Sequence, residues 1–152
     1  MPQIPVTTRL SSDRPLVKID NNAVPNPAAG QGFSITVPVG YRAQPVSLFF
    51  TMVTDANVAN RFFVLDFVTS SGVVFRSAPA WPQTASETRS LCFAAGVSPI
   101  LHSVTVFSGL QPVPPGFTLQ EGDSIVLSVT GIQAGDQISL VNAQLLSQFV
   151  AE

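Results

Sequence analysis

The chain has 152 residues, a length typical of one domain with a single hydrophobic core. Hydrophobic residues make up 45% of it and charged residues only 11%, against about 25% charged residues in an ordinary soluble domain. The net charge of −2 and the scattered arginines argue against a nucleic-acid-binding protein, which needs clustered basic residues to displace counterions from phosphates. With so few charges, we expect a surface covered partly by uncharged polar side chains and partly by other protein.

The chain also lacks the sequence signs of a membrane span, a signal peptide and a disulfide. No apolar run approaches the roughly 20 residues that a membrane-spanning helix needs. The first residues, MPQIPVTTRLSSDRP, lack the charged start and apolar stretch of a signal peptide. Cys92 is the only cysteine, which excludes an internal disulfide and a cysteine-based metal site. We therefore expect a protein that is made in a cytoplasm and stays soluble.

Residues 1–31 contain five prolines and are predicted to form an extended N-terminal arm. Proline fixes φ and lacks an N–H group, so the segment disfavours the interior of a sheet, although short strands are compatible with residues 4–8 and 16–19. A disordered tail is the alternative, but the segment is more apolar than disordered segments usually are. We expect the arm to contact a neighbouring subunit through Ile4, Val6, Leu10, Leu16, Val17 and Ile19.

Residues 32–152 are predicted to form a β-sandwich domain, because apolar and polar residues alternate clearly from residue 33 onward. Residues 46–53 and 61–68 are two runs dense in Phe, Val and Leu on either side of a polar bend, residues 54–60. We expect two neighbouring strands at the centre of the core. Both faces of these runs are partly apolar, so Phe49 and Phe62 are predicted to meet the arm, a second layer or a neighbouring copy.

The later part of the chain carries further short strand patterns separated by turn signals. Two Gly-Asp turns each precede an apolar run, and a proline-rich loop cannot enter a sheet interior. Strands are predicted at residues 73–75, 83–94, 101–107, 124–129, 137–141 and 145–150. Many short strands without an amphipathic helix indicate an all-β antiparallel sandwich, and their number makes a jelly roll the specific prediction.

The sequence gives no sign of catalysis. His102 is the only histidine, and no serine lies in a nucleophile motif. Asp66 lies in the middle of a predicted strand, where we expect a structural ion pair with Arg61 or Arg76 rather than a catalytic acid. Neither a calcium-binding loop nor a glycine-rich phosphate loop is present, and Cys92 has the surroundings of a buried thiol. We expect no enzyme activity, no cofactor and no metal site.

Four segments, taken in order, resemble parts of small virion proteins of tailed bacteriophages. They are the run Val46 to Arg61 with its Ala-Asn-Val-Ala-Asn-Arg bend, the segment Gln83-Thr84-Ala85-Ser86 leading to Phe93-Ala94-Ala95-Gly96, the loop Val113-Pro114-Pro115-Gly116-Phe117, and the turn Ala134-Gly-Asp-Gln-Ile-Ser. The resemblance covers roughly residues 40–140. Each segment alone is a common turn or strand device, so the order of the segments carries the resemblance.

The resemblance implies a structural part of a phage virion. The leading hypothesis is a capsid decoration (cement) protein on the capsid surface, a homo-oligomer and specifically a trimer, that binds the major capsid protein across subunit joints. The alternatives are a tail or head–tail component, or a receptor-binding tip with lectin-like sugar contacts; a cell-wall hydrolase is the least favoured. Nucleic acid and membranes are not expected partners.

Overall fold

The computed structural model describes residues 17–104 and 107–150, which form ten strands and no helix. Alternating apolar residues and frequent turn residues give short strands throughout. The strands are β1 (Val17–Ala23), β2 (Phe33–Thr36), β3 (Tyr41–Val53), β4 (Phe62–Thr69), β5 (Gly72–Ser77), β6 (Thr88–Ala95), β7 (Ile100–Val104), β8 (Phe107–Val113), β9 (Ser124–Thr130) and β10 (Gln137–Phe149).

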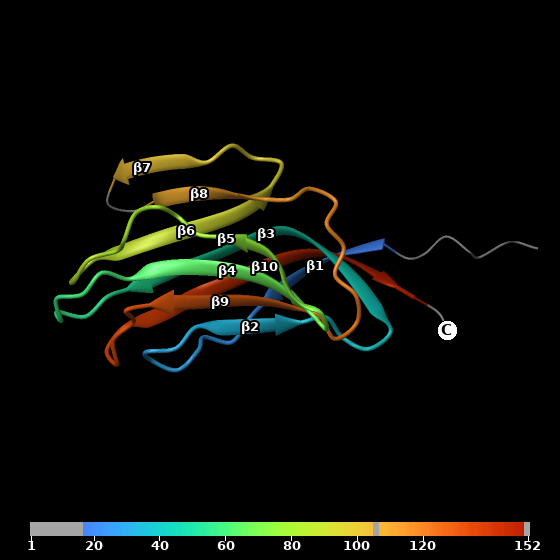
Figure 1. Ribbon diagram of the computed structural model, residues 1–152, viewed down its shortest axis with the longest axis horizontal. Coiled ribbons are helices and arrows are strands. Elements are labelled where there is room, and N and C mark those ends of the chain that lie inside the picture. The colour runs from blue at the N-terminus through green and yellow to red at the C-terminus, as the bar shows by residue number, and fades with distance from the viewer. Residues whose placement is uncertain (1–16, 105–106, 151–152) are drawn as a thin grey trace, which may run out of the picture.

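The strands form two sheets that pack face to face. The larger sheet has the order β1-β10-β3-β6-β8-β7, and the smaller has the order β2-β9-β4-β5. The nested orders β1-β10-β3-β6 and β2-β9-β4-β5 are those of a jelly roll, and the β7–β8 hairpin widens the larger sheet at one edge (Figure 1). All strand pairs are antiparallel except β6–β8, which is parallel. The predicted antiparallel sandwich of jelly-roll type is confirmed.

The two apolar runs at the centre of the sequence lie in opposite sheets. β3 pairs with β10 and β6, whereas β4 pairs with β9 and β5, so the prediction that they are neighbouring strands is wrong. The bend at residues 54–60 is too long for a tight hairpin turn and crosses from one sheet to the other. Each run instead buries its apolar face against the other run across the sandwich.

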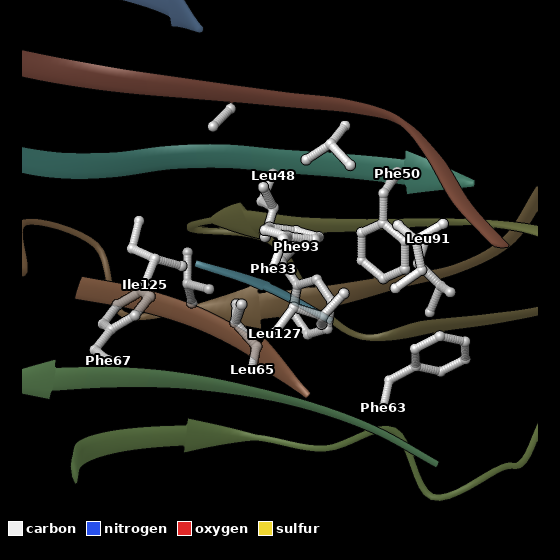
Figure 2. Packing of buried hydrophobic residues seen from close by; sticks show 14 of the residues in the cluster. Phe33, Leu48, Phe50, Phe63, Leu65, Phe67, Leu91, Phe93, Ile125 and Leu127 are labelled. Atoms are coloured by element: carbon white, nitrogen blue, oxygen red, sulfur yellow. The ribbon is translucent and has the colours of Figure 1, made fainter. Parts of the chain in front are cut away.

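The core lies between these sheets, and phenylalanine rings dominate it. The ring of Phe50 in β3 lies 5.7 Å from that of Phe63 in β4 and 5.9 Å from that of Phe33, with the last pair edge to face (Figure 2). Burying each such side chain stabilises the fold by about 1.5–3 kcal/mol. The alternation predicted in both strands is confirmed by the buried residues Leu48, Phe50, Met52, Phe63, Leu65 and Phe67.

One residue of β3 departs from the predicted alternation. Strict alternation along residues 46–53 would put Val46 on the buried face with Leu48, but Val46 is 38% exposed. The register against β10 shifts at this point, because Gln144 pairs with Ser47 whereas Leu145 pairs with Pro45. Val46 is therefore the extra residue of a β-bulge, and a bulge turns its side chain outward.

Strand β1 brings part of the predicted arm into the larger sheet. It pairs with β10 from Val17 opposite Gln148 to Ala23 opposite Asn142. The strand fits between Pro15 and Pro25, so every residue of β1 has an N–H group and none interrupts the ladder. Residues 1–16 lie outside the described residues, and for them the arm stays a prediction.

Candidate functional site

Arg61 is a charged side chain buried completely in the sandwich, with an exposed fraction of 0%. It lies at the end of the bend, directly before β4. Its Nε and Nη2 groups donate to the two carboxylate oxygens of Asp136, both at 2.9 Å, and Nη2 also donates to Oδ1 of Asp55 at 2.7 Å. Nη1 donates to the carbonyl oxygens of Asn57 at 3.0 Å and Ala59 at 2.7 Å. Every N–H group of the guanidinium is therefore satisfied.

Asp136 is held by backbone groups as well as by Arg61. Its Oδ1 accepts the N–H of Asp55 at 2.9 Å, and its Oδ2 accepts the N–H of Gln133 at 2.7 Å. Burial alone raises the pKa of Asp136, but the hydrogen bonds from Arg61 and from these two N–H groups outweigh it, so the pKa lies below its ordinary value. The hydrogen bond to Asp136 raises the pKa of Arg61 although burial opposes it. The pair therefore stays ionised.

Two glycines let the bend lie against the turn that precedes β10. A Cβ atom on Gly135 would lie 2.7 Å from Oδ2 of Asp55. A Cβ atom on Gly131, whose φ is +79°, would lie 2.3 Å from the carbonyl oxygen of Asn60. Any side chain at either position would push the bend away from its partner, so close approach requires glycine at both.

A third segment closes the same site. Arg61 and Gln83 exchange backbone hydrogen bonds of 2.9 and 3.0 Å, and Nε2 of Gln83 donates to the carbonyl oxygen of Met52 at 2.9 Å. The hydroxyl of Thr54 donates to the carbonyl oxygen of Thr84 at 2.6 Å. We call residues 54–61, 83–87 and 133–136 the Arg61 cluster. It brings together three of the segments that carry the phage resemblance, and its interactions are those of a structural site.

Asp66 forms the structural ion pair predicted for it. Nε and Nη2 of Arg76 donate to its two carboxylate oxygens at 2.7 and 2.8 Å. The two residues are directly opposite each other in the β4–β5 ladder. Of the two predicted partners Arg76 is therefore confirmed, whereas Arg61 is wrong because Asp136 and Asp55 engage its side chain.

The remaining candidates for chemistry named from the sequence are His102 and Cys92. His102 lies in β7, but its side chain is outside the described residues. Cys92 is half-buried, and burial raises the pKa of its thiol, which disfavours the nucleophilic thiolate. Within residues 17–104 and 107–150, no group of three or more His, Cys, Asp and Glu side chains could hold a metal ion. The same residues form no helix that could span a membrane.

The predicted interface residues do not form one surface. Phe49 is half-buried on the outer face of the larger sheet, whereas Phe62 is 40% exposed on the outer face of the smaller sheet. Val17 and Ile19 lie in the edge strand β1, but their side chains are outside the described residues. The others lie outside the described residues altogether, and they are Ile4, Val6, Leu10 and Leu16. Their contacts stay predictions.

An exposed apolar surface that the sequence did not indicate lies at the N-terminal end of β3, the end that is far from the Arg61 cluster. Tyr41 and Phe149 pair in the β3–β10 ladder, and their rings lie edge to face at 5.4 Å. Val150 donates its N–H to the carbonyl oxygen of Gly40 at 2.8 Å. The exposed fractions are 79% for Val39, 39% for Tyr41, 52% for Phe149 and 44% for Val150. We call these four residues the Tyr41–Phe149 patch.

Sequence reasoning missed the Arg61 cluster and this patch for different reasons. A signal for the cluster was present, since Arg61 follows a polar bend in a chain with very few charges. Its partner Asp136 belongs to one of the two Gly-Asp turns, and nothing in the sequence pairs positions so far apart. The patch had no signal, because apolar residues at strand ends look the same whether they face a core or solvent.

Comparisons with known proteins identify no family for this chain. No protein-family model matches it, and no curated protein is similar to it. A chain from the structure of infectious bursal disease virus Gt strain aligns with a TM-score of 0.35 and 18% identity, over 98% of this chain and 36% of that chain. A chain of the Gx strain aligns with a TM-score of 0.27 and 10% identity, over 100% and 46%. This chain thus spans less than half of either viral chain, and TM-scores below 0.5 carry no argument about function.

Proposed function

We propose that the chain is a structural protein of a phage virion, and specifically a capsid decoration (cement) protein that binds across capsid subunits. The observation that carries the proposal is the surface of the sandwich, where apolar side chains are exposed over a densely packed core. Val58 is 98% exposed, Leu140 68% and Val73 51%. Burying such groups against another protein is favourable in proportion to their area, so they are available for contacts in an assembly.

The likeness to small virion proteins supports the same proposal. Three of the four segments that carry it meet in the Arg61 cluster, where they join the ends of β3, β4, β6 and β10. If the same segments occur in the same order in small virion proteins, those proteins could connect the strands of their sandwich in the same way. The β-sandwich alone does not imply a function, so the proposal depends on the surface and the likeness together.

Decoration would work by burying apolar surface. A low charge suits contacts that depend on apolar burial, and many weakly bound copies on one lattice stabilise a shell together. The partner we propose is the major capsid protein, and a homotrimer is the proposed oligomer. We further propose that the chain is not an enzyme, since Asp66 is engaged by Arg76 and the Cys92 thiol is half-buried.

The lectin-like alternative depends on an aromatic ring that is free to stack on a sugar. Trp81 is half-buried, and a Cβ atom on Gly109 of β8 would lie 2.5 Å from its ring. The guanidinium of Arg89 lies 5.5 Å from the centre of the same ring. Because protein groups already occupy this ring, the sugar-binding alternative would depend on an exposed ring such as Tyr41, and it is the weaker proposal.

Electron microscopy of intact particles tests the proposal. A decoration protein is expected at positions that repeat with the capsid lattice, in a copy number that is a fixed ratio to the major capsid protein. Density confined to the tail or to one vertex would favour the tail or head–tail alternative. Particles that lack the chain would contradict any virion role.

A further inference from the structure

The Tyr41–Phe149 patch lies where the N-terminal segment enters the larger sheet. Val17, the first residue of β1, pairs with Gln148, and the next residue along β10 is Phe149. Neighbouring strands lie about 4.8 Å apart, so the chain before Val17 begins beside the patch. The patch also includes Val150, the last residue that the structure describes.

Residues 1–16 have the composition and the length to cover this patch. They carry four large aliphatic residues and only three charged ones, Arg9, Asp13 and Arg14. A 16-residue segment reaches about 50 Å when extended, far more than the distance back to Phe149. Burying exposed apolar surface is favourable in proportion to its area, and the patch is otherwise exposed to water.

We infer that residues 1–16 dock on the Tyr41–Phe149 patch of their own chain. A tethered segment meets a nearby site at an effective concentration of millimolar order. A second copy would need a comparable concentration to compete, so the segment of the same chain is the occupant in dilute solution. The inference does not depend on the proposed virion role. That role concerns what the whole protein binds in a particle, whereas the docking proposed here is within one chain.

Nitration of Tyr41 by tetranitromethane tests the inference in the full chain. Tyr41 is the only tyrosine, so the reaction reports a single position in the patch. The test variant is the triple substitution Ile4→Ser, Val6→Ser and Leu10→Ser. The matched control is Gln3→Ser, Thr7→Ser and Thr8→Ser, which changes the same segment without removing apolar groups.

The expected result is nitration about threefold faster or more in the test variant, and an unchanged rate in the control, because only the former weakens apolar docking. In the unsubstituted chain the rate should not change on dilution. Equal rates in all three proteins would overturn the inference. Protection of Tyr41 that fades on dilution would assign the patch to a second copy and overturn docking within one chain. If the triple variant does not fold by circular dichroism, Leu10→Ser alone gives the same readout.

Discussion

The Arg61–Asp136 and Arg76–Asp66 ion pairs have almost the same geometry in opposite surroundings. Each arginine donates two hydrogen bonds to one carboxylate, at 2.9 and 2.9 Å in the first pair and 2.7 and 2.8 Å in the second. In the first pair both side chains are 0% exposed, whereas in the second Arg76 is 61% exposed and Asp66 11%. Water can replace the partner of an exposed charge but cannot reach a buried one, so similar bonds should differ greatly in their effect on stability.

The pairs also differ in what they connect. Arg61 and Asp136 are 75 positions apart and join the bend between the sheets to the turn before β10. Asp66 and Arg76 are 10 positions apart and lie in two strands that the ladder already pairs. The Arg61–Asp136 pair therefore helps to fix how the two sheets are connected, whereas the Arg76–Asp66 pair adds to two strands that backbone hydrogen bonds already pair.

The largest effect is expected from Arg61→Met, which leaves the Asp136 carboxylate buried without its cation. We expect a loss of about 3–5 kcal/mol in the free energy of unfolding. Urea denaturation measures it, with Arg76→Met as the matched control, for which we expect a smaller loss because water reaches the Asp66 carboxylate in part. Similar losses in the two variants would contradict the assigned difference between the pairs.

A smaller loss is expected when only the charge of the acid is removed. The two Gly-Asp turns have the same local bond, since Asp123 accepts the N–H of Gln120 and Asp136 that of Gln133, both at 2.7 Å. Asp136→Asn should cost about 2–4 kcal/mol because Arg61 loses its main partner. Asp123→Asn should cost about 1 kcal/mol or less, because only the turn is affected. Urea denaturation of the two variants checks this, with the lower midpoint expected for Asp136→Asn. Equal midpoints would contradict the difference assigned to the two turns.

Lowering the pH should destabilise the folded protein by protonating Asp136 and so breaking its ion pair with Arg61. The pKa of this carboxyl is lower in the folded protein than the ordinary 3.8, so its contribution is present above that pH and is lost as the pH falls through the folded pKa. The pKa of Glu87 is lowered as well, so part of the acid sensitivity will remain without Asp136. Unfolding free energies measured below about pH 4 should therefore fall less steeply in Asp136→Asn than in the unsubstituted chain.

The smallest effect is expected from Asp66→Asn. The amide keeps the shape of the carboxyl, and the guanidinium of Arg76 can turn to water when its charged partner is removed. We expect a urea midpoint close to that of the unsubstituted chain. A loss as large as that of Asp136→Asn would mean that Arg76 is less accessible to water than its exposure indicates.

Local features of this fold could be predicted from the sequence because they have a period of two residues. The alternation in β3 and β4 follows directly from the apolar pattern, and so does the position of Asp66 beside an arginine on a neighbouring strand. The layer to which each strand belongs could not be predicted, since a strand with two partly apolar faces fits either a hairpin or two facing sheets. The Arg61–Asp136 bond depends on that arrangement and was hidden for the same reason.

A double-mutant cycle on Arg61 and Asp136 tests most directly whether the Arg61 cluster holds the sandwich together. The cycle uses Arg61→Met, Asp136→Leu and the double variant, and its coupling energy separates the pair from the other effects of each change. We expect a coupling of about 2 kcal/mol or more, while the same cycle on Arg76 and Asp66 gives a smaller coupling, of about 1 kcal/mol or less, because Arg76 is exposed to water. A coupling between Arg61 and Asp136 no larger than that between Arg76 and Asp66 would contradict the structural role assigned to the cluster.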